Sequence, residues 1–255
     1  GFVAGAPEDA VDFIAHRGAS AYAPENTLAA FDLAVEQGSD WFELDCTLSK
    51  DGAVVVIHDG DLDRTTDGVG KVANTTLADL KKLDAGSWFS TDFAGEPLPT
   101  LAEALDLAYD RIGVYIEIKD SDNDNRLMND IIAIPDKDQD CLTRPQRMDV
   151  MRLIEDSGTR NLELTRKVIA MVRERGMERQ VVIQSFSPIV CAIVVEEAPD
   201  LRAEFLGSES KDHPGRWPSY VRWQHLIGVK GCNISFGSLT PERLDLFHSQ
   251  GRSVA

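Results

Sequence analysis

The chain has 255 residues, 43% hydrophobic and 27% charged, which suits one large domain with a substantial core rather than a disordered chain. Its formal net charge is −17, which argues against nucleic acid or an anionic membrane as a partner, because phosphate-rich surfaces require a basic face. A small phosphate-bearing substrate stays open, provided that a metal, arginine or lysine supplies a local positive site.

Neither the cysteines nor the hydropathy identify a compartment. The scattered cysteines show no metal-ligand spacing, which indicates structural thiols. No apolar run approaches the roughly 20 residues that span a bilayer, so we expect no stable membrane insertion. The first ten residues show no signal peptide, and one removed before this numbering would leave no trace. Cytoplasmic, periplasmic and secreted locations therefore stay open, as does the oligomeric state.

The first part of the chain alternates predicted strands and helices. The apolar run at 11–15 predicts a buried strand, and residues 24–27 open an amphipathic helix that runs to about Gln37. Residues 41–59 then predict two strands joined by a turn at 50–52.

Residues 59–99 predict a small excursion of turns with one short helix at 77–83. Thr100 is a good N-cap for a helix at 101–109, with Glu103 placed to complete a capping box. An apolar strand at 113–119 follows.

Residues 120–160 interrupt this alternation and predict an inserted loop, with a helix near 146–156. The acidic spacing at 120–124 is similar to the start of a calcium-binding loop, but Arg126 stands where the glycine belongs and Ile131 where the glutamate belongs. We therefore interpret the stretch as a solvated acidic loop.

The alternation resumes after residue 160. Predicted helices span 162–175, 189–197 and 241–249, and predicted strands span 180–186, 201–206 and 231–236. A loop with Trp217 and Trp223 precedes the last of these strands, and residues 252–255 look like the opening of an eighth. Because strand–helix–strand units at this spacing are parallel, we predict an α/β fold, a (β/α)8 TIM barrel, as a single domain over residues 1–255.

Polar side chains fall at the C-terminal ends of the predicted strands. In a parallel barrel these ends meet at one mouth, where the active sites of such folds lie. The residues are His16, Arg17, Glu43, Asp45, His58, Asp59, Glu117, Lys119, Gln184 and Ser185. Solvated carboxylates and helix-capping histidines are the alternative interpretation. It would require polar residues to occur independently at the ends of several strands, so we disfavour it.

These residue types form a consistent chemical set. The hard oxygen ligands that Mg²⁺ and Ca²⁺ prefer come from Glu43, Asp45 and Glu117. An acid and a base for neutral pH are available in His16 and His58. A phosphate can be held by Arg17 and Lys119.

The order and spacing of these motifs resemble the glycerophosphodiester phosphodiesterase family. The matching motifs are His16-Arg17-Gly18, Pro24-Glu25-Asn26-Thr27, Glu43-Leu44-Asp45, the segment 51–59, Asp63-Arg64-Thr65-Thr66 and Leu98-Pro99-Thr100-Leu101. Ile116-Glu117-Ile118-Lys119 and Gln184-Ser185-Phe186 complete the resemblance, which covers residues 13–206 apart from the insertion.

The resemblance implies metal-dependent hydrolysis of glycerophosphodiesters to sn-glycerol 3-phosphate and an alcohol, with one divalent cation, Mg²⁺ or Ca²⁺, as cofactor. By position, His16 and His58 would be the acid/base pair. The metal ligands would be Glu43, Asp45 and Glu117. Substrate and phosphate binding would fall to Arg17, Lys119, Gln184 and Phe186. We expect the substrate's own glycerol hydroxyl to attack, giving a cyclic phosphate, with His16 as base and His58 as acid.

Two features depart from the family pattern. The insertion at 120–160 follows directly on Lys119, so we expect it to affect substrate choice. The family usually continues through an eighth strand and a last helix, and we expect both to be missing from this chain. Sphingomyelinase D-like or phospholipase C-like chemistry, and a non-catalytic phosphodiester-binding barrel, stay as alternatives.

Overall fold

The computed structural model describes residues 12–136, 139–208 and 216–254, so Val11 of the predicted first strand and Ala255 of the predicted eighth lie outside the described residues. The chain divides into two compact units. The first holds residues up to Lys119 together with 166–182, and the second holds 120–165 together with residues from Ile183 onward. Parallel strands with intervening helices in both units confirm the predicted α/β class, whereas no observation tests the single-domain prediction.

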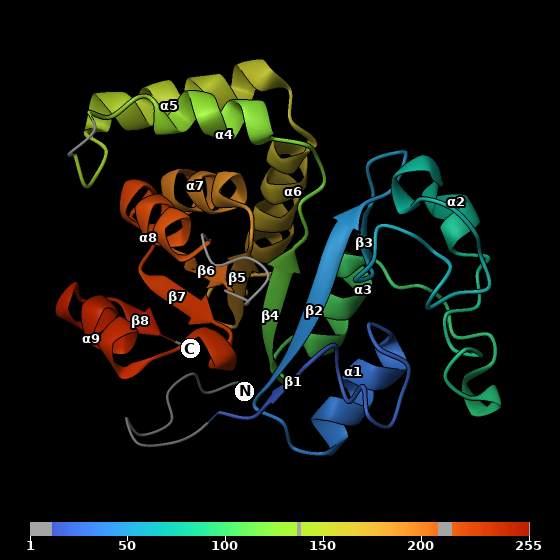
Figure 1. Cartoon of the computed structure of the whole chain (residues 1–255). Helices are drawn as coiled ribbons and strands as arrows, with labels where there is room; N and C mark the ends of the chain where they lie inside the picture. The colour runs from blue at the N-terminus through green and yellow to red at the C-terminus, as the bar shows by residue number, and fades with distance from the viewer. Residues whose placement is uncertain (1–11, 137–138, 209–215, 255) are drawn as a thin grey trace. The chain divides into compact units, whose positions relative to one another are not determined.

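The sheet of the first unit is built on β2 (Trp41–Leu48), which lies between β1 (Ile14–Ala15) and β4 (Gly113–Ile118) and pairs in parallel with both. Figure 1 shows β2 and β4 running side by side. Strand β3 (Val54–Val56) pairs with β2 in the antiparallel sense. The strand pair predicted at 41–59 is therefore a hairpin, and the prediction that its second strand joins the parallel series is wrong.

Helix caps fix where the helices of the first unit begin. Helix α1 (Leu28–Glu36) begins after Thr27, whose hydroxyl accepts from the Ala30 amide, and α3 (Leu101–Ala108) begins at the predicted Thr100–Glu103 capping box. Most of α6 (Arg160–Glu174) and the first residues of β5 (Val181–Ser185) also belong to this unit.

The excursion at 59–99 carries its own apolar core. It contains the 3₁₀ turns η1 (Val72–Asn74) and η2 (Thr91–Phe93) and the short helix α2 (Leu77–Leu80). Its buried side chains pack with those that end the hairpin: Val55, Ile57, Leu62, Val72, Leu80, Ala85 and Leu98. This packing anchors the end of β3, where His58 follows.

The second unit has parallel strands β6 (Arg202–Gly207), β7 (Gly231–Ile234) and β8 (Ser253–Val254). Because β8 pairs with β7, the prediction that the eighth strand is missing is wrong. A strand of two residues is too short to show a pattern, so the sequence suggested only its opening. Helix α7 (Pro188–Glu197) leads into β6, and the turn η3 (Phe236–Ser238) and helix α9 (Pro241–Ser249) connect β7 to β8.

Two further helices correct the predicted loops of the second unit. The insertion contains α4 (Asn125–Ile132), which was not predicted, and α5 (Arg144–Ser157), which confirms the helix predicted near 146–156. The expected loop with Trp217 and Trp223 is α8 (Arg216–Ile227). Buried side chains at helical spacing explain these helices: Leu127, Ile131, Val150, Ile154, Tyr220, Trp223 and Ile227. Pro218 lies in the first turn of α8, where a missing N–H costs nothing. Among the described helices, none combines the length and apolarity needed to cross a bilayer.

Candidate active site

Three carboxylates converge in the first unit. Glu43 and Asp45 are two apart on β2 and so point to the same face, and the register of β2 with β4 sets Glu117 opposite Asp45. One ligand oxygen from each of the three lies within 4.8 Å of the others. Among the residues that the structure describes, this is the group of acidic side chains with metal-ligand geometry.

The chemistry of this group fits a hard divalent cation. The Oε1 atom of Glu43 is buried and accepts no hydrogen bond from any described residue. Burial, and then the charge of Asp45, raise the pKa of Glu43 to about 8. A buried carboxylate with a vacant lone pair beside two further acids is stabilised by a bound cation with oxygen preference.

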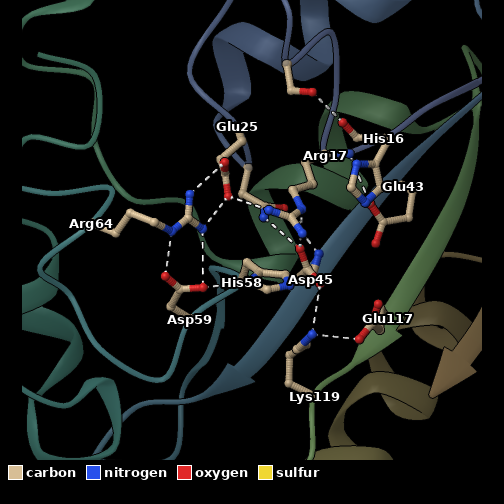
Figure 2. A network of polar contacts seen from close by, with 12 residues as sticks. His16, Arg17, Glu25, Glu43, Asp45, His58, Asp59, Arg64, Glu117 and Lys119 are labelled. Atoms are coloured by element: carbon tan, nitrogen blue, oxygen red, sulfur yellow. Dashed lines mark hydrogen bonds and ion pairs between the residues drawn. The ribbon is translucent and has the colours of Figure 1, made fainter. Parts of the chain in front are cut away.

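Two cations lie against the carboxylates (Figure 2). The Lys119 ammonium is 2.7 Å from Glu117 Oε1 and 3.5 Å from Asp45 Oδ1. Burial alone would lower the pKa of Lys119, but its hydrogen bond to Glu117 and the nearby acidic charges outweigh burial and raise it. The Arg17 guanidinium donates to Glu25 at 2.9 Å, and its Nε lies 3.5 Å from Asp45 Oδ2. The raised pKa keeps Lys119 charged beside the site.

The backbone after β1 is bent so that Arg17 reaches this cluster. Arg17 has a φ of +59° and Gly18 a φ of +79°, and the Arg17 amide donates to Glu43 Oε2 at 3.0 Å. The backbone of Asn26 is also in the left-handed region. Its side-chain amide donates to the Asp45 carboxylate at 2.9 Å and accepts from the Asp45 backbone amide at 3.1 Å. These contacts orient the two carboxylates of β2.

The two histidines differ in their surroundings. His16 is largely exposed, with its Nε2 3.9 Å from Glu43 Oε2, and partial burial followed by the Arg17 charge lowers its pKa. His16 is therefore neutral at pH 7, the form that a base requires. The Nδ1 of His58 lies 2.6 Å from Asp59 Oδ1.

A further set of ion pairs lies beside His58. Arg64 contacts both Asp59 and Glu25 with its guanidinium. Burial would raise the pKa of Glu25, but hydrogen bonds from Arg64 and Arg17 outweigh it and lower the pKa. The sequence interpretation missed the role of Arg64, although the motif Asp63-Arg64-Thr65-Thr66 pointed to it.

The remaining predicted substrate residues, Gln184 and Phe186, belong to the second unit. Gln184 is buried on β5, and its Oε1 accepts no hydrogen bond within the described part of the chain. Phe186 follows β5 and is exposed. Their roles in substrate binding stay predictions.

The sequence matches known proteins over most of its length. The profile of the Glycerophosphoryl diester phosphodiesterase family matches residues 16–255. A glycerophosphodiester phosphodiesterase of Caldanaerobacter subterraneus subsp. tengcongensis is 40% identical over 194 residues, which is 76% of this chain and 65% of the relative. The alignments to three curated relatives span 44% to 65% of those relatives' own length.

Solved structures share the fold. A glycerophosphodiester phosphodiesterase from Agrobacterium tumefaciens str. C58 aligns with a TM-score of 0.68 at 30% identity, covering 96% of this chain and 85% of that one. An Oleispira antarctica phosphodiesterase in complex with the product sn-glycerol-3-phosphate aligns with a TM-score of 0.72 at 27% identity, covering 96% and 83%.

Proposed function

We propose, since the chain belongs to the glycerophosphoryl diester phosphodiesterase family, that it hydrolyses glycerophosphodiesters to sn-glycerol 3-phosphate and an alcohol with a divalent cation as cofactor. The observation that carries the proposal is the convergence of three carboxylates, Glu43, Asp45 and Glu117, beside two cationic side chains. The product found in the Oleispira antarctica neighbour supports the same substrate class here.

The substrate is an anion, so the site must first neutralise its charge. Glu43, Asp45 and Glu117 would hold Mg²⁺ or Ca²⁺, which would supply positive charge for the phosphoryl oxygens. Arg17 and Lys119 would bind the same phosphate through hydrogen bonds that strengthen as charge develops in the transition state. Both cations already lie within 3.5 Å of Asp45, so their charges are gathered before the substrate arrives.

The two histidines would move the protons. His16, neutral because of its lowered pKa, takes the proton of the substrate's neighbouring glycerol hydroxyl, whose oxygen attacks phosphorus. The bond from phosphorus to the leaving alcohol breaks, and Nε2 of His58 gives that alcohol its proton. Water then opens the resulting cyclic phosphate: His58 takes the proton of the water, and His16 returns its proton to the glycerol oxygen.

The finer features of the fold belong to the same proposal. In the barrel that the resemblance implies, Gln184 and Phe186 would contact the substrate. The excursion at 59–99 would shape the glycerol end of the pocket, and the insertion at 120–160 would affect which alcohol is released.

The direct test is a panel of glycerophosphodiesters with choline, ethanolamine, inositol or glycerol as the alcohol. We expect metal-dependent release of sn-glycerol 3-phosphate from at least one of them, and its loss with a chelator. Accumulation of a cyclic phosphate as the final product would instead indicate a phospholipase C-like reaction. Absence of turnover with every substrate and both cations would contradict the proposal.

A further inference from the structure

Arg64 lies between two carboxylates in the site (Figure 2). Its Nε and Nη2 donate to Asp59 at 2.6 and 3.2 Å, and its Nη1 and Nη2 donate to Glu25 at 2.9 and 2.8 Å. Two bidentate pairs on one guanidinium fix its plane in a way that a lysine ammonium does not reproduce. Arg64 is thus committed to the protein and is not placed to bind a substrate.

Each of these two carboxylates also contacts a residue of the proposed mechanism. Asp59 lies 2.6 Å from the Nδ1 of His58, and Glu25 accepts from Nη1 of Arg17 at 2.9 Å. The Arg64 hydrogen bond lowers the pKa of Asp59, so Asp59 is ionised and can only accept. The hydrogen on that side therefore belongs to Nδ1, which leaves Nε2 as the nitrogen that exchanges protons.

We infer that Arg64 is a positioning residue of the reaction: through Asp59 it holds His58 with its hydrogen on Nδ1, and through Glu25 it holds the Arg17 guanidinium beside Asp45. The inference rests on the proposed function for its kinetic consequences. A merely structural ion pair is the competing explanation, because exposed ion pairs usually contribute little. The two explanations predict different kinetics.

Arg111 provides a matched control. Its side chain is 45% exposed, against 43% for Arg64, and it pairs with Asp32 at 2.9 Å away from the carboxylate cluster. Arg111→Lys changes an arginine–carboxylate ion pair of similar exposure without touching a residue of the site. We expect its turnover and its thermal unfolding to equal those of the unchanged protein.

Steady-state kinetics of Arg64→Lys, Asp59→Asn and the double variant test the inference. We expect Arg64→Lys to lower kcat by about 10–100-fold, the range typical of partners that orient a functional histidine. KM should change less than kcat, because Arg17 loses the support that Arg64 gives through Glu25 but keeps its own contact with Asp45. Since Arg64 would act through Asp59, the double variant should be no slower than the slower single variant. Normal kcat in Arg64→Lys, a loss confined to KM, or multiplied losses in the double variant would overturn the inference.

A second readout is independent of turnover. The ¹⁵N chemical shifts of the imidazole nitrogens report which one carries the hydrogen in the neutral ring, and His58→Gln assigns the signal among the five histidines. We expect the Nδ1–H tautomer in the unchanged protein and a mixture of tautomers in Arg64→Lys. An unchanged tautomer in Arg64→Lys would refute the positioning role. If no substrate is turned over, the proposed function fails, and this spectrum still decides the inference.

Discussion

Two acid-rich stretches of this chain look similar in sequence and differ in what their oxygens contact. On β2, Glu43 and Asp45 are buried, and one oxygen of Glu43 has no hydrogen-bond partner among the described residues. Their neighbours are Arg17 and Lys119. The carboxylates of β2 are therefore held in place with bonding capacity left over.

The stretch at 120–124 places its acids in a turn before α4. Asp120 and Asp124 both accept from the side-chain amide of Asn161, at 2.6 and 2.8 Å, and Thr159 donates to Asp124 as well. The carboxylate of Asp122 accepts backbone amides, including that of Arg160 at 3.0 Å. These acids are satisfied by the protein itself.

The comparison shows that acidic spacing alone does not identify a metal site. A spacing of two on a strand keeps both carboxylates on one face, whereas a turn imposes no such parity. The decisive feature is whether the carboxylate oxygens already accept hydrogen bonds from donors of the protein. We expect the stretch at 120–124 to act in folding, and the β2 carboxylates to act in binding and turnover.

Neutralising the two acids of β2 should have the largest effect. The variant Glu43→Gln/Asp45→Asn removes two proposed ligands, and loss of about 5 kcal/mol of transition-state stabilisation corresponds to roughly 10⁴-fold in turnover. Asp122→Asn is the matched control in the other stretch and should keep normal turnover. Similar losses in the two variants would contradict the distinction.

Replacing either histidine should lower turnover by about 10²–10⁴-fold. Because His16 and His58 would act as one proton-transfer pair, the double alanine variant should be little worse than the poorer single variant. Turnover of a substrate analogue without the neighbouring glycerol hydroxyl checks the same step. Near-normal hydrolysis of that analogue would exclude the cyclic route, and a near-normal single variant would exclude the pair.

Without a cation, stability should depend on pH through Glu43. Its pKa of about 8 in the folded protein lies above the ordinary glutamate pKa of 4.5, so the folded protein binds this proton more tightly than the unfolded chain. The contribution is present below pH 4.5 and is lost as the pH rises towards about 8. In chelator, we expect the free energy of unfolding to fall by a few kcal/mol across this window, at about 1.4 kcal/mol per pKa unit. Glu43→Gln should remove that fall; an equal fall in the variant would show that another group causes it.

Saturating cation should raise stability by about 2.7 kcal/mol at a hundred times its dissociation constant. Thermal unfolding measures this as a rise of several degrees in Tm for a chain of this size. Asp122→Asn should retain the rise and Glu43→Gln should lose it. If Asp122→Asn lost the rise, the cation would bind at the acidic turn.

Removing the amide that satisfies the acidic turn should have a smaller effect, and on stability alone. Asn161 is fully buried, and Asn161→Ala leaves Asp120 and Asp124 without its two hydrogen bonds. We expect a loss of about 1–3 kcal/mol in the free energy of unfolding with turnover retained at permissive temperature. Unchanged stability, or a loss of turnover in protein that remains folded, would contradict this account of the turn.

The sequence predicted the parts of the site that depend on local geometry. Strand parity was enough to place Glu43 and Asp45 on one face, and the capping box of α3 followed from Thr100 and Glu103. The bridge from Arg64 to Glu25 spans 39 residues of sequence and depends on how the excursion packs, which no periodicity encodes. Helix α4 was missed because it has only 8 residues, half of them polar, and α8 because Pro218 and several polar residues interrupt its apolar positions.

We expect the carboxylates of β2 to hold the cation that turnover requires. The most direct measurement is release of sn-glycerol 3-phosphate by the unchanged protein, by Glu43→Gln/Asp45→Asn and by Asp122→Asn, each titrated with Mg²⁺ or Ca²⁺ after chelation. We expect the cation to restore turnover in the unchanged protein and in Asp122→Asn but not in the double variant. Turnover that survives complete chelation, or that cation restores in the double variant, would contradict it.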